Sequence, residues 1–256
     1  MNPQIIYASI TGISENVDKK YYDVIAQADS GIISINGEDD DMKISTSIVD
    51  AFSGMKLAYA ISSALYAREK TKSGCKITVS MKGSAFDLLE QNLIAASISK
   101  ENPQKVGNMD NAIAPFGVFK TKDSAVVIAI GNENQWKVFE SFLRKNNKFF
   151  PADIYASNHL RLQNIKKLKI EIENILRKYS CDDAVKILEA LRIPCAKVKT
   201  MVDVADDQEN YEEKLLEKIN HPVAGEIVVS SGGIFFSEFK KDKYTKAPKL
   251  KVKRRV

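Results

Sequence analysis

The feature that most constrains the fold is a long, nearly uncharged segment between residues 51 and 70. Apart from Lys56, no charged side chain interrupts it before Arg68. Its apolar and small residues recur on every side of a helix rather than along one stripe, which is typical of a helix that other elements cover. The segment therefore predicts a long interior helix. A single carboxylate, that of Asp50, stands at its start.

Short apolar runs alternate with helical patterns over the rest of the chain, which predicts an α/β protein. We expect strands over 5–10, 76–81 and 195–200, and a hairpin over 117–130 that turns at 122–124. A helix is expected over 21–31, closing at Gly31 and followed by an extended piece. Further helices are expected over 83–99, 132–147, 160–176, 182–193 and 207–219. The last expected element is a hairpin with a Gly-Gly turn over 225–237. A loose polar stretch around residues 100–110 predicts a domain boundary.

The positive net charge of the chain comes from its C-terminal tail. Residues 240–256 contain nine Lys or Arg and one Asp, a contribution of +8, so the other residues sum to −3 for the total of +5. A nucleic acid or an anionic surface is one partner for such a tail, but a solvated end is the better interpretation. We therefore expect no nucleic-acid partner.

Several function classes are excluded by what the sequence lacks. No run approaches eighteen uninterrupted apolar residues, and the first ten residues do not form a signal peptide, so we expect neither a membrane span nor secretion. The three cysteines and two histidines are too scattered for a disulfide framework or a metal site; they are Cys75, Cys181, Cys195, His159 and His221. This cysteine usage favours a reducing cytoplasm.

A specific signal comes from the order and wording of six blocks, since the chain shows no dinucleotide fingerprint, P-loop or nucleophile elbow. The blocks are "NPQIIYASITG", "YYDVIAQADSGIISINGE", "IVDAFSGMKLAYAISSALYAREKTKSG", "APFGVFKTKDSAVVIAIGNENQW", "IPCAKV" and "HPVAGEI". In this order they resemble the family III CoA-transferases, also called the CaiB/BaiF family. The resemblance extends over most of the chain.

The resemblance implies a fold and an activity. The fold would be a Rossmann-like large domain, present here in part as 1–105, and a smaller α/β domain at 106–200; residues 201–256 would return to the large domain and end in the basic tail. Two chains would interlock as a homodimer. Members move coenzyme A between an acyl-CoA and a small carboxylic acid, or racemise 2-methylacyl-CoA thioesters. Coenzyme A would be a substrate, with no covalently bound cofactor and no metal.

Asp50 has two interpretations. An Asp before an apolar helix is usually an N-cap, worth about 1 kcal/mol. The resemblance places at this position the aspartate that forms anhydride and aspartyl-CoA intermediates in the transferases, with Gly54 four residues later. The two roles are compatible because a helix N-terminus favours an anion and offers free N–H groups to an oxyanion. We therefore predict that Asp50 is both cap and nucleophile.

The block Lys20, Tyr21, Tyr22 and Asp23 matches the family stretch that contacts coenzyme A near the thioester. From the residues alone, a helix start with aromatic packing is equally consistent. Position 22 separates the family's activities, because racemases carry a histidine there as one member of an acid–base pair. A tyrosine with a pKa near 10 replaces it poorly, so racemase activity is disfavoured.

Glu133, in "GNENQW", matches a small-domain loop over the family's active site and is predicted to orient substrate. A polar turn capped by Asn132 is the alternative. We interpret His221 as structural, and Arg161 and Asn164 as interdomain scaffolding.

Relative to the family pattern, the chain starts at a block that normally lies in mid-domain. We therefore expect weak binding of coenzyme A and an exposed sheet edge. The rival to transferase activity is a catalytically silent homologue or a partner-dependent subunit.

Overall fold

The computed structural model describes residues 2–238 and divides the chain into two compact units, Met1–Ala196 and Lys197–Val256. The basic tail, residues 240–256, lies outside the described residues. Each unit is described by itself below.

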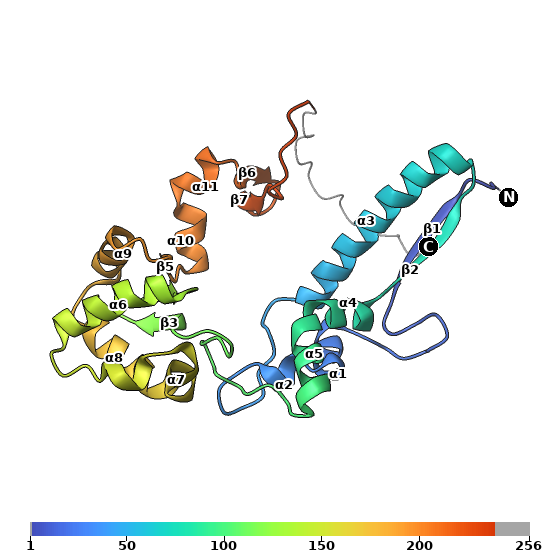
Figure 1. Cartoon of the computed structure of the whole chain (residues 1–256). Coiled ribbons are helices and arrows are strands. Elements are labelled where there is room, and N and C mark those ends of the chain that lie inside the picture. The colour runs from blue at the N-terminus through green and yellow to red at the C-terminus, as the bar shows by residue number, and fades with distance from the viewer. Residues whose placement is uncertain (1, 239–256) are drawn as a thin grey trace. The chain divides into compact units, whose positions relative to one another are not determined.

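The first unit opens with a parallel pair of strands covered by one long helix. Strand β1 (Ile6–Thr11) pairs with β2 (Cys75–Ser80) in a register that sets Ile6 opposite Cys75. Helix α3 (Ile48–Thr71) is the last element of the connection from β1 to β2 and packs along both strands (Figure 1). The predicted strands and the predicted long helix are confirmed.

The prediction that α3 lies in the interior is wrong for this chain. Val49 and Ser53 are its only buried residues, and three large side chains on it are mostly exposed: Met55 (66%), Tyr59 (76%) and Tyr66 (66%). The reason is that two strands and two short helices, α1 and α4, cover only part of a helix that is apolar nearly all round. The remainder of α3 is an apolar surface without cover in the described chain.

Four short helices complete the first part of this unit: α1 (Asp23–Ser30), α2 (Ile32–Ile35), α4 (Met81–Leu88) and α5 (Glu90–Ser99). A small core forms where α1, α3 and α4 meet; its buried members are Ala26, Ile32, Val49, Met81 and Ala85. Two expectations are corrected here. The chain after Gly31 forms α2 rather than an extended piece, and the single helix expected over 83–99 is divided at Leu89 into two.

The larger core belongs to residues 109–195. Strands β3 (Phe116–Lys120), β4 (Ala125–Ala129) and β5 (Cys195–Lys197) form a sheet in that order, and the predicted hairpin is confirmed as β3–β4. The helices of this part are α6 (Glu133–Asn146), η1 (Ala152–Tyr155), α7 (Asn158–Gln163), α8 (Ile165–Leu176) and α9 (Cys181–Ala190). Their apolar stripes enclose large buried side chains, among them Phe119, Trp136, Phe139, Leu168 and Ile172.

The second unit contains α10 (Met201–Asp206), α11 (Gln208–Glu212), β6 (Leu216–His221) and β7 (Gly225–Ser230). The helix expected over 207–219 ends at Glu212, because the residues from Leu216 onward pair with β7 instead. The hairpin turn follows His221 rather than the Gly-Gly pair. The Nδ1 atom of His221 accepts hydrogen bonds from the N–H groups of Val223 and Ala224, so this histidine is structural.

Candidate active site at the start of helix α3

Asp50 lies in the first turn of α3, on the surface. The helix begins at Ile48, its N-cap residue is Ser47, and Ser47 makes no side-chain capping bond. Asp50 is therefore the third residue of the helix, and the prediction that its own carboxylate caps α3 is wrong. The side chain is exposed and not sealed in a core.

The cap of α3 comes from a different carboxylate. Oδ1 of Asp23, the first residue of α1, accepts hydrogen bonds from the N–H of Val49 at 2.8 Å and from the N–H of Asp50 at 3.2 Å. The first N–H groups of a helix have no partner within it, and an anion there is favoured by the helix dipole. Asp23 is thus the residue that caps α3, a role predicted for Asp50, and the carboxylate of Asp50 makes no capping bond.

A buried amide holds Asp23 in turn. Gln27 lies one turn further along α1 and is fully buried. Its Nε2 donates to Oδ2 of Asp23 at 2.6 Å and to the carbonyl of Ile44 at 3.2 Å, while its Oε1 accepts from the N–H of Ile44 at 2.8 Å. Sequence reasoning missed Gln27; the signal was an amide one turn after Asp23 on the inner face of α1.

The four residues of the Lys20–Asp23 block divide into two kinds. Lys20 is exposed, and Tyr22 is 70% exposed at the N-cap position of α1. Tyr21 is partly buried: its hydroxyl donates to Asp29 at 2.8 Å, and desolvation followed by that carboxylate raises its pKa. A methyl group on Gly12 would lie 2.4 Å from Cβ of Tyr21, so this glycine permits a close approach. Only Lys20 and Tyr22 present free side chains, and contact of this block with coenzyme A stays a prediction.

Glu133 begins α6 and is engaged by a buried arginine. The guanidinium of Arg161, whose side chain is 3% exposed, donates to Oε1 of Glu133 at 2.5 Å and to Oε2 at 3.3 Å. The hydrogen bond from Arg161 is the main cause that lowers the pKa of Glu133. The same guanidinium donates to the carbonyls of Ala114 at 2.6 Å and Tyr155 at 3.2 Å and lies over the ring of Trp136.

This arrangement corrects one interpretation and leaves another open. Arg161 ties together elements of the 109–195 core, and Asn164 links the end of α7 to η1 by donating to the carbonyl of Ile154 at 3.5 Å, so the bonds that the structure gives both residues lie within this core rather than between domains. The structure gives Glu133 a partner in Arg161. Its role toward substrate, and its approach to Asp50 across a dimer, stay predictions.

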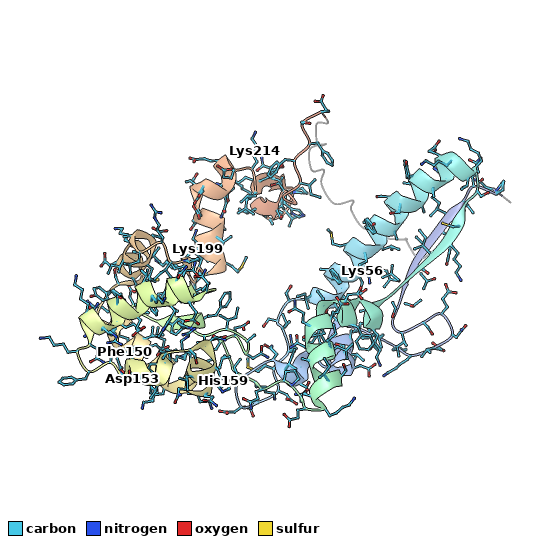
Figure 2. All side chains as sticks on the ribbon, in the orientation of Figure 1. Lys56, Phe150, Asp153, His159, Lys199 and Lys214 are labelled. Atoms are coloured by element: carbon cyan, nitrogen blue, oxygen red, sulfur yellow. The ribbon has the colours of Figure 1, made fainter. Side chains whose placement is uncertain are left out.

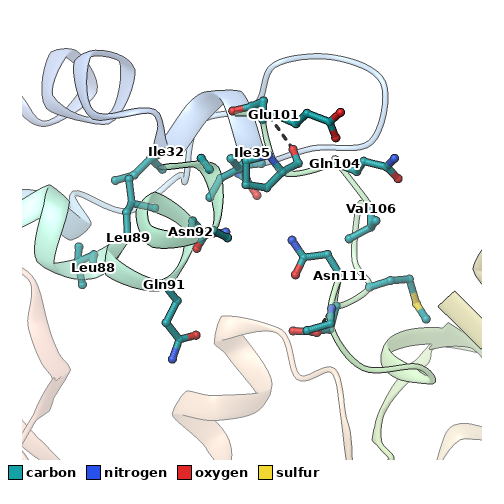
Figure 3. A pocket seen from close by; sticks show the side chains of 18 of the residues that line it. Ile32, Ile35, Leu88, Leu89, Gln91, Asn92, Glu101, Gln104, Val106 and Asn111 are labelled. Atoms are coloured by element: carbon teal, nitrogen blue, oxygen red, sulfur yellow. Dashed lines mark hydrogen bonds between the residues drawn. The ribbon is translucent and has the colours of Figure 1, made fainter. Parts of the chain in front are cut away.

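A cavity of about 870 Å³ is lined in part by the segment that leads into α3. Its wall includes Ile44 and Ile48, and the side chains of Asn92 and Asn111 lie on opposite sides of it (Figure 3). Glu101 and Asp110 also line it, whereas no Lys, Arg or His is among its described lining residues. None of the predicted site residues lines this cavity, so it is separate from the surface at Asp50.

The other ionic contacts near α3 are peripheral. Lys56 on α3 forms an ion pair with Asp87 on α4 (Figure 2). Among residues 2–238 no cluster of three His, Cys, Asp or Glu side chains is arranged to hold a metal ion, and every helix is too short or too polar to span a bilayer.

The family model that matches this sequence is that of CoA-transferase family III, and the match covers residues 1–253. The chain belongs to CoA-transferase family III. A crystal structure of a CaiB/BaiF family protein from Brucella suis has the same fold, with a TM-score of 0.80 and 27% identity, over 97% of this chain and 66% of that one. The family resemblance and the family-type α/β fold expected from the sequence are confirmed.

Curated relatives of this family III chain are named as transferases. Succinyl-CoA:glutarate CoA-transferase of Mus musculus is 29% identical over 97% of this chain and 58% of its own length. Acetyl-CoA:oxalate CoA-transferase of Acetobacter aceti is also 29% identical, over 91% of this chain and 58% of its own length. The chain therefore spans about three fifths of the length of the curated relatives it matches.

Proposed function

We propose that this chain carries the nucleophile of a CoA transfer between an acyl-CoA and a small carboxylic acid, and that the nucleophile is Asp50. The observation that carries the proposal is the placement of Asp50: an exposed carboxylate in the first turn of α3, with its own N–H held by Asp23 at 3.2 Å. The family and the names of its relatives support the reaction class.

The proposed reaction has two half-reactions that balance. The Asp50 carboxylate attacks the thioester carbonyl, and the C–S bond breaks to give an acyl-aspartyl anhydride and CoA thiolate. The thiolate then attacks the aspartyl carbonyl, which releases the first acid and leaves aspartyl-CoA. The incoming carboxylate attacks aspartyl-CoA and again expels the thiolate, which captures the new acyl group from the second anhydride and regenerates Asp50.

The residues around Asp50 have limited parts in this proposal. Tyr22 and Lys20 are exposed on the segment that precedes Asp23, where they are available to the pantetheine and to an anionic group of the substrate. Asp23 keeps the helix start in place and is not required to touch substrate. Tyr22 stands where a racemase would have its histidine, so 2-methylacyl-CoA racemisation is the less favoured activity.

A second candidate is a partner-dependent subunit or a catalytically silent homologue. The specific observation that favours it is the set of exposed apolar side chains on α3, which a partner chain would cover. A homodimer would cover part of that surface. The cytoplasm remains the proposed location on the sequence argument given above.

Trapping of the intermediate tests the proposal directly. The chain is incubated with succinyl-CoA and treated with hydroxylamine or borohydride, and the peptide containing residue 50 is analysed by mass spectrometry. We expect a hydroxamate or a reduced side chain at Asp50. Asp50→Asn should show neither product, because an amide forms no anhydride.

The matched control is Asp153→Asn, which removes an exposed carboxylate from η1 in the other core (Figure 2). In Asp153→Asn, Asp50 should be labelled to the same extent as in the unchanged chain. Turnover retained by Asp50→Asn would refute the nucleophile, and absence of any labelling in the unchanged chain would favour the silent or partner-dependent alternative.

A further inference from the structure

Gln27 has an environment that a packing role alone does not require. It is fully buried, yet its amide makes three hydrogen bonds, and none of them is to its own helix backbone. We propose that Gln27 is a positioning residue for the reaction at Asp50 and acts through Asp23. The inference rests on the proposed function of Asp50 and adds a residue that the family resemblance did not single out.

The three bonds use the amide in a way that no other side chain of its size reproduces. A glutamine offers two N–H donors and a carbonyl acceptor at one end. Here the donors reach the Asp23 carboxylate at 2.6 Å and the carbonyl of Ile44 at 3.2 Å, and the acceptor receives the N–H of Ile44 at 2.8 Å. A glutamate could accept from Ile44 but could not donate to Asp23, and a leucine could do neither.

The bond to Asp23 decides which oxygen faces α3. Because Oδ2 is taken by Gln27, Oδ1 is left for the N–H groups of Val49 and Asp50. A carboxylate fixed at both oxygens cannot rotate away from the helix start. Hydrogen bonds to an ionised acceptor are roughly twice as strong as neutral ones, so this contact is a firm one.

The bonds to Ile44 fix the other approach to the same helix. Residue 44 lies four positions before the first residue of α3, and both of its backbone groups are bound to the Gln27 amide. One side chain on α1 therefore ties down the segment that enters α3 and, through Asp23, the first N–H groups of α3 itself. The start of α3 is thus held through Asp23, and the segment that enters it is held at Ile44.

We call the hydrogen bonds of Gln27 to Asp23 and Ile44 the brace of α3. Fixing the helix start in this way affects a nucleophile more than a core residue, because a nucleophile must be placed accurately. A carboxylate attacking a thioester must approach the carbonyl carbon in a narrow range of positions, and a misplacement of about 1 Å costs about 100-fold in rate. Loss of the brace should therefore lower the rate of attack while leaving the substrate's distant contacts intact. A residue that only packs would change stability and not this rate.

The test compares Gln27→Leu and Gln27→Glu with Asn146→Leu. Asn146 lies in the other core, where its amide donates to the carbonyl of Phe142 and accepts from the hydroxyl of Tyr179, so the control removes similar bonds away from α3. Two quantities are measured: hydrogen exchange of the Val49 and Asp50 amides by NMR, and kcat and KM for CoA transfer from succinyl-CoA to glutarate.

We expect both Gln27 variants to accelerate exchange at Val49 and Asp50 at least tenfold and to lower kcat at least tenfold, with KM within about twofold. Asn146→Leu should change neither the exchange of the Val49 and Asp50 amides nor kcat. The double variant Asp23→Asn with Gln27→Glu restores a donor–acceptor pair in reverse, and should recover part of the kcat lost in Gln27→Glu.

Failure of this inference and failure of the proposed function give different results. Unchanged exchange at both amides in Gln27→Leu overturns the brace whether or not the chain turns over. Faster exchange with unchanged kcat overturns the positioning role. An unchanged chain that neither turns over nor labels Asp50 overturns the proposed function and, with it, a role for Gln27 in that reaction.

Discussion

Replacement of Glu133 by glutamine separates a structural role for this carboxylate from a role toward substrate. The carboxylate accepts two hydrogen bonds from Arg161, whose side chain is 3% exposed, while the side chain of Glu133 itself is 52% exposed. In Glu133→Gln the guanidinium keeps its bonds to the carbonyls of Ala114 and Tyr155 but loses its counter-ion. The variant thus removes the charge of one partner and one of the two oxygens that accept from Arg161.

The expected cost lies between the values for exposed and buried pairs. An exposed ion pair contributes about 0.2–1 kcal/mol, whereas removing one partner of a fully buried pair costs about 3–5 kcal/mol. Because water reaches Glu133 but not Arg161, we expect a loss of about 1–2 kcal/mol in the free energy of unfolding. Glu140→Gln on the same helix removes a surface pair with Arg144 and should cost less than about 0.5 kcal/mol.

The pH dependence gives a second, independent signature. The folded-state pKa of Glu133 is lowered, chiefly by the hydrogen bond from Arg161. A lowered pKa contributes stability that is present above the unfolded value of about 4.3 and is lost as the pH falls through the folded value. The difference between the unchanged chain and Glu133→Gln should therefore be largest at neutral pH and shrink below about pH 4.

Urea unfolding followed by the fluorescence of Trp136 measures this difference. It is the only tryptophan of the chain, and Arg161 lies 4.6 Å from the centre of its ring. The reasoning would be refuted if Glu133→Gln were no less stable than Glu140→Gln at neutral pH, or if its deficit did not shrink on acidification. The ion pair with Arg161 would then contribute little to stability, and a role toward substrate would be the remaining explanation for this carboxylate.

Three further predictions concern the first part of the chain. Asp23→Ala should lower the free energy of unfolding by about 1–2 kcal/mol because it removes the cap of α3, whereas Asp50→Ala should lower it by less than about 0.5 kcal/mol. Urea unfolding followed by circular dichroism measures both values, and equal losses would contradict the assignment of the cap to Asp23. Gly74→Ala should destabilise the chain by more than about 2 kcal/mol, because the added Cβ would lie 1.9 Å from the carbonyl oxygen of Ile5. Gly54→Ala should stabilise α3 by up to about 1 kcal/mol, because nothing lies within 4 Å of the added Cβ. Light scattering at micromolar concentration should show a dimer that Tyr59→Lys weakens, and a clean monomer for the unchanged chain would count against the covered α3 surface.

Local pattern predicted most of the elements correctly. The strands at β1 and β2, the hairpin of β3 and β4, and the amphipathic helices of the 109–195 core follow periodicities that a few neighbouring residues determine. One prediction that is wrong concerns competition between elements. Residues 216–219 read as the end of a charged helix, yet they pair with β7, a contact that periodicity within the helix does not encode.

The environment of α3 was beyond reach for a different reason. Its composition correctly predicted a helix and correctly predicted that most of its surface is apolar. Whether that surface is covered depends on what packs against it. Within residues 2–238 the elements in extensive contact with α3 are β1, β2, α4 and α1. The sequence of a helix specifies the kind of surface it presents, not its occupant.

The division of labour between Asp23 and Asp50 shows the same limit at the site. Capping rules relate a side chain to N–H groups two or three residues later, so they direct attention to the acid nearest the helix start, which is Asp50. The observed cap lies 26 positions before Val49, on another helix, and depends on an amide that fixes its second oxygen. Since Asp23 accepts from the first N–H groups of α3, the carboxylate of Asp50 makes no capping bond of its own. A carboxylate without a capping bond, on a residue whose N–H is held by Asp23, is what we expect if Asp50 is the nucleophile proposed above.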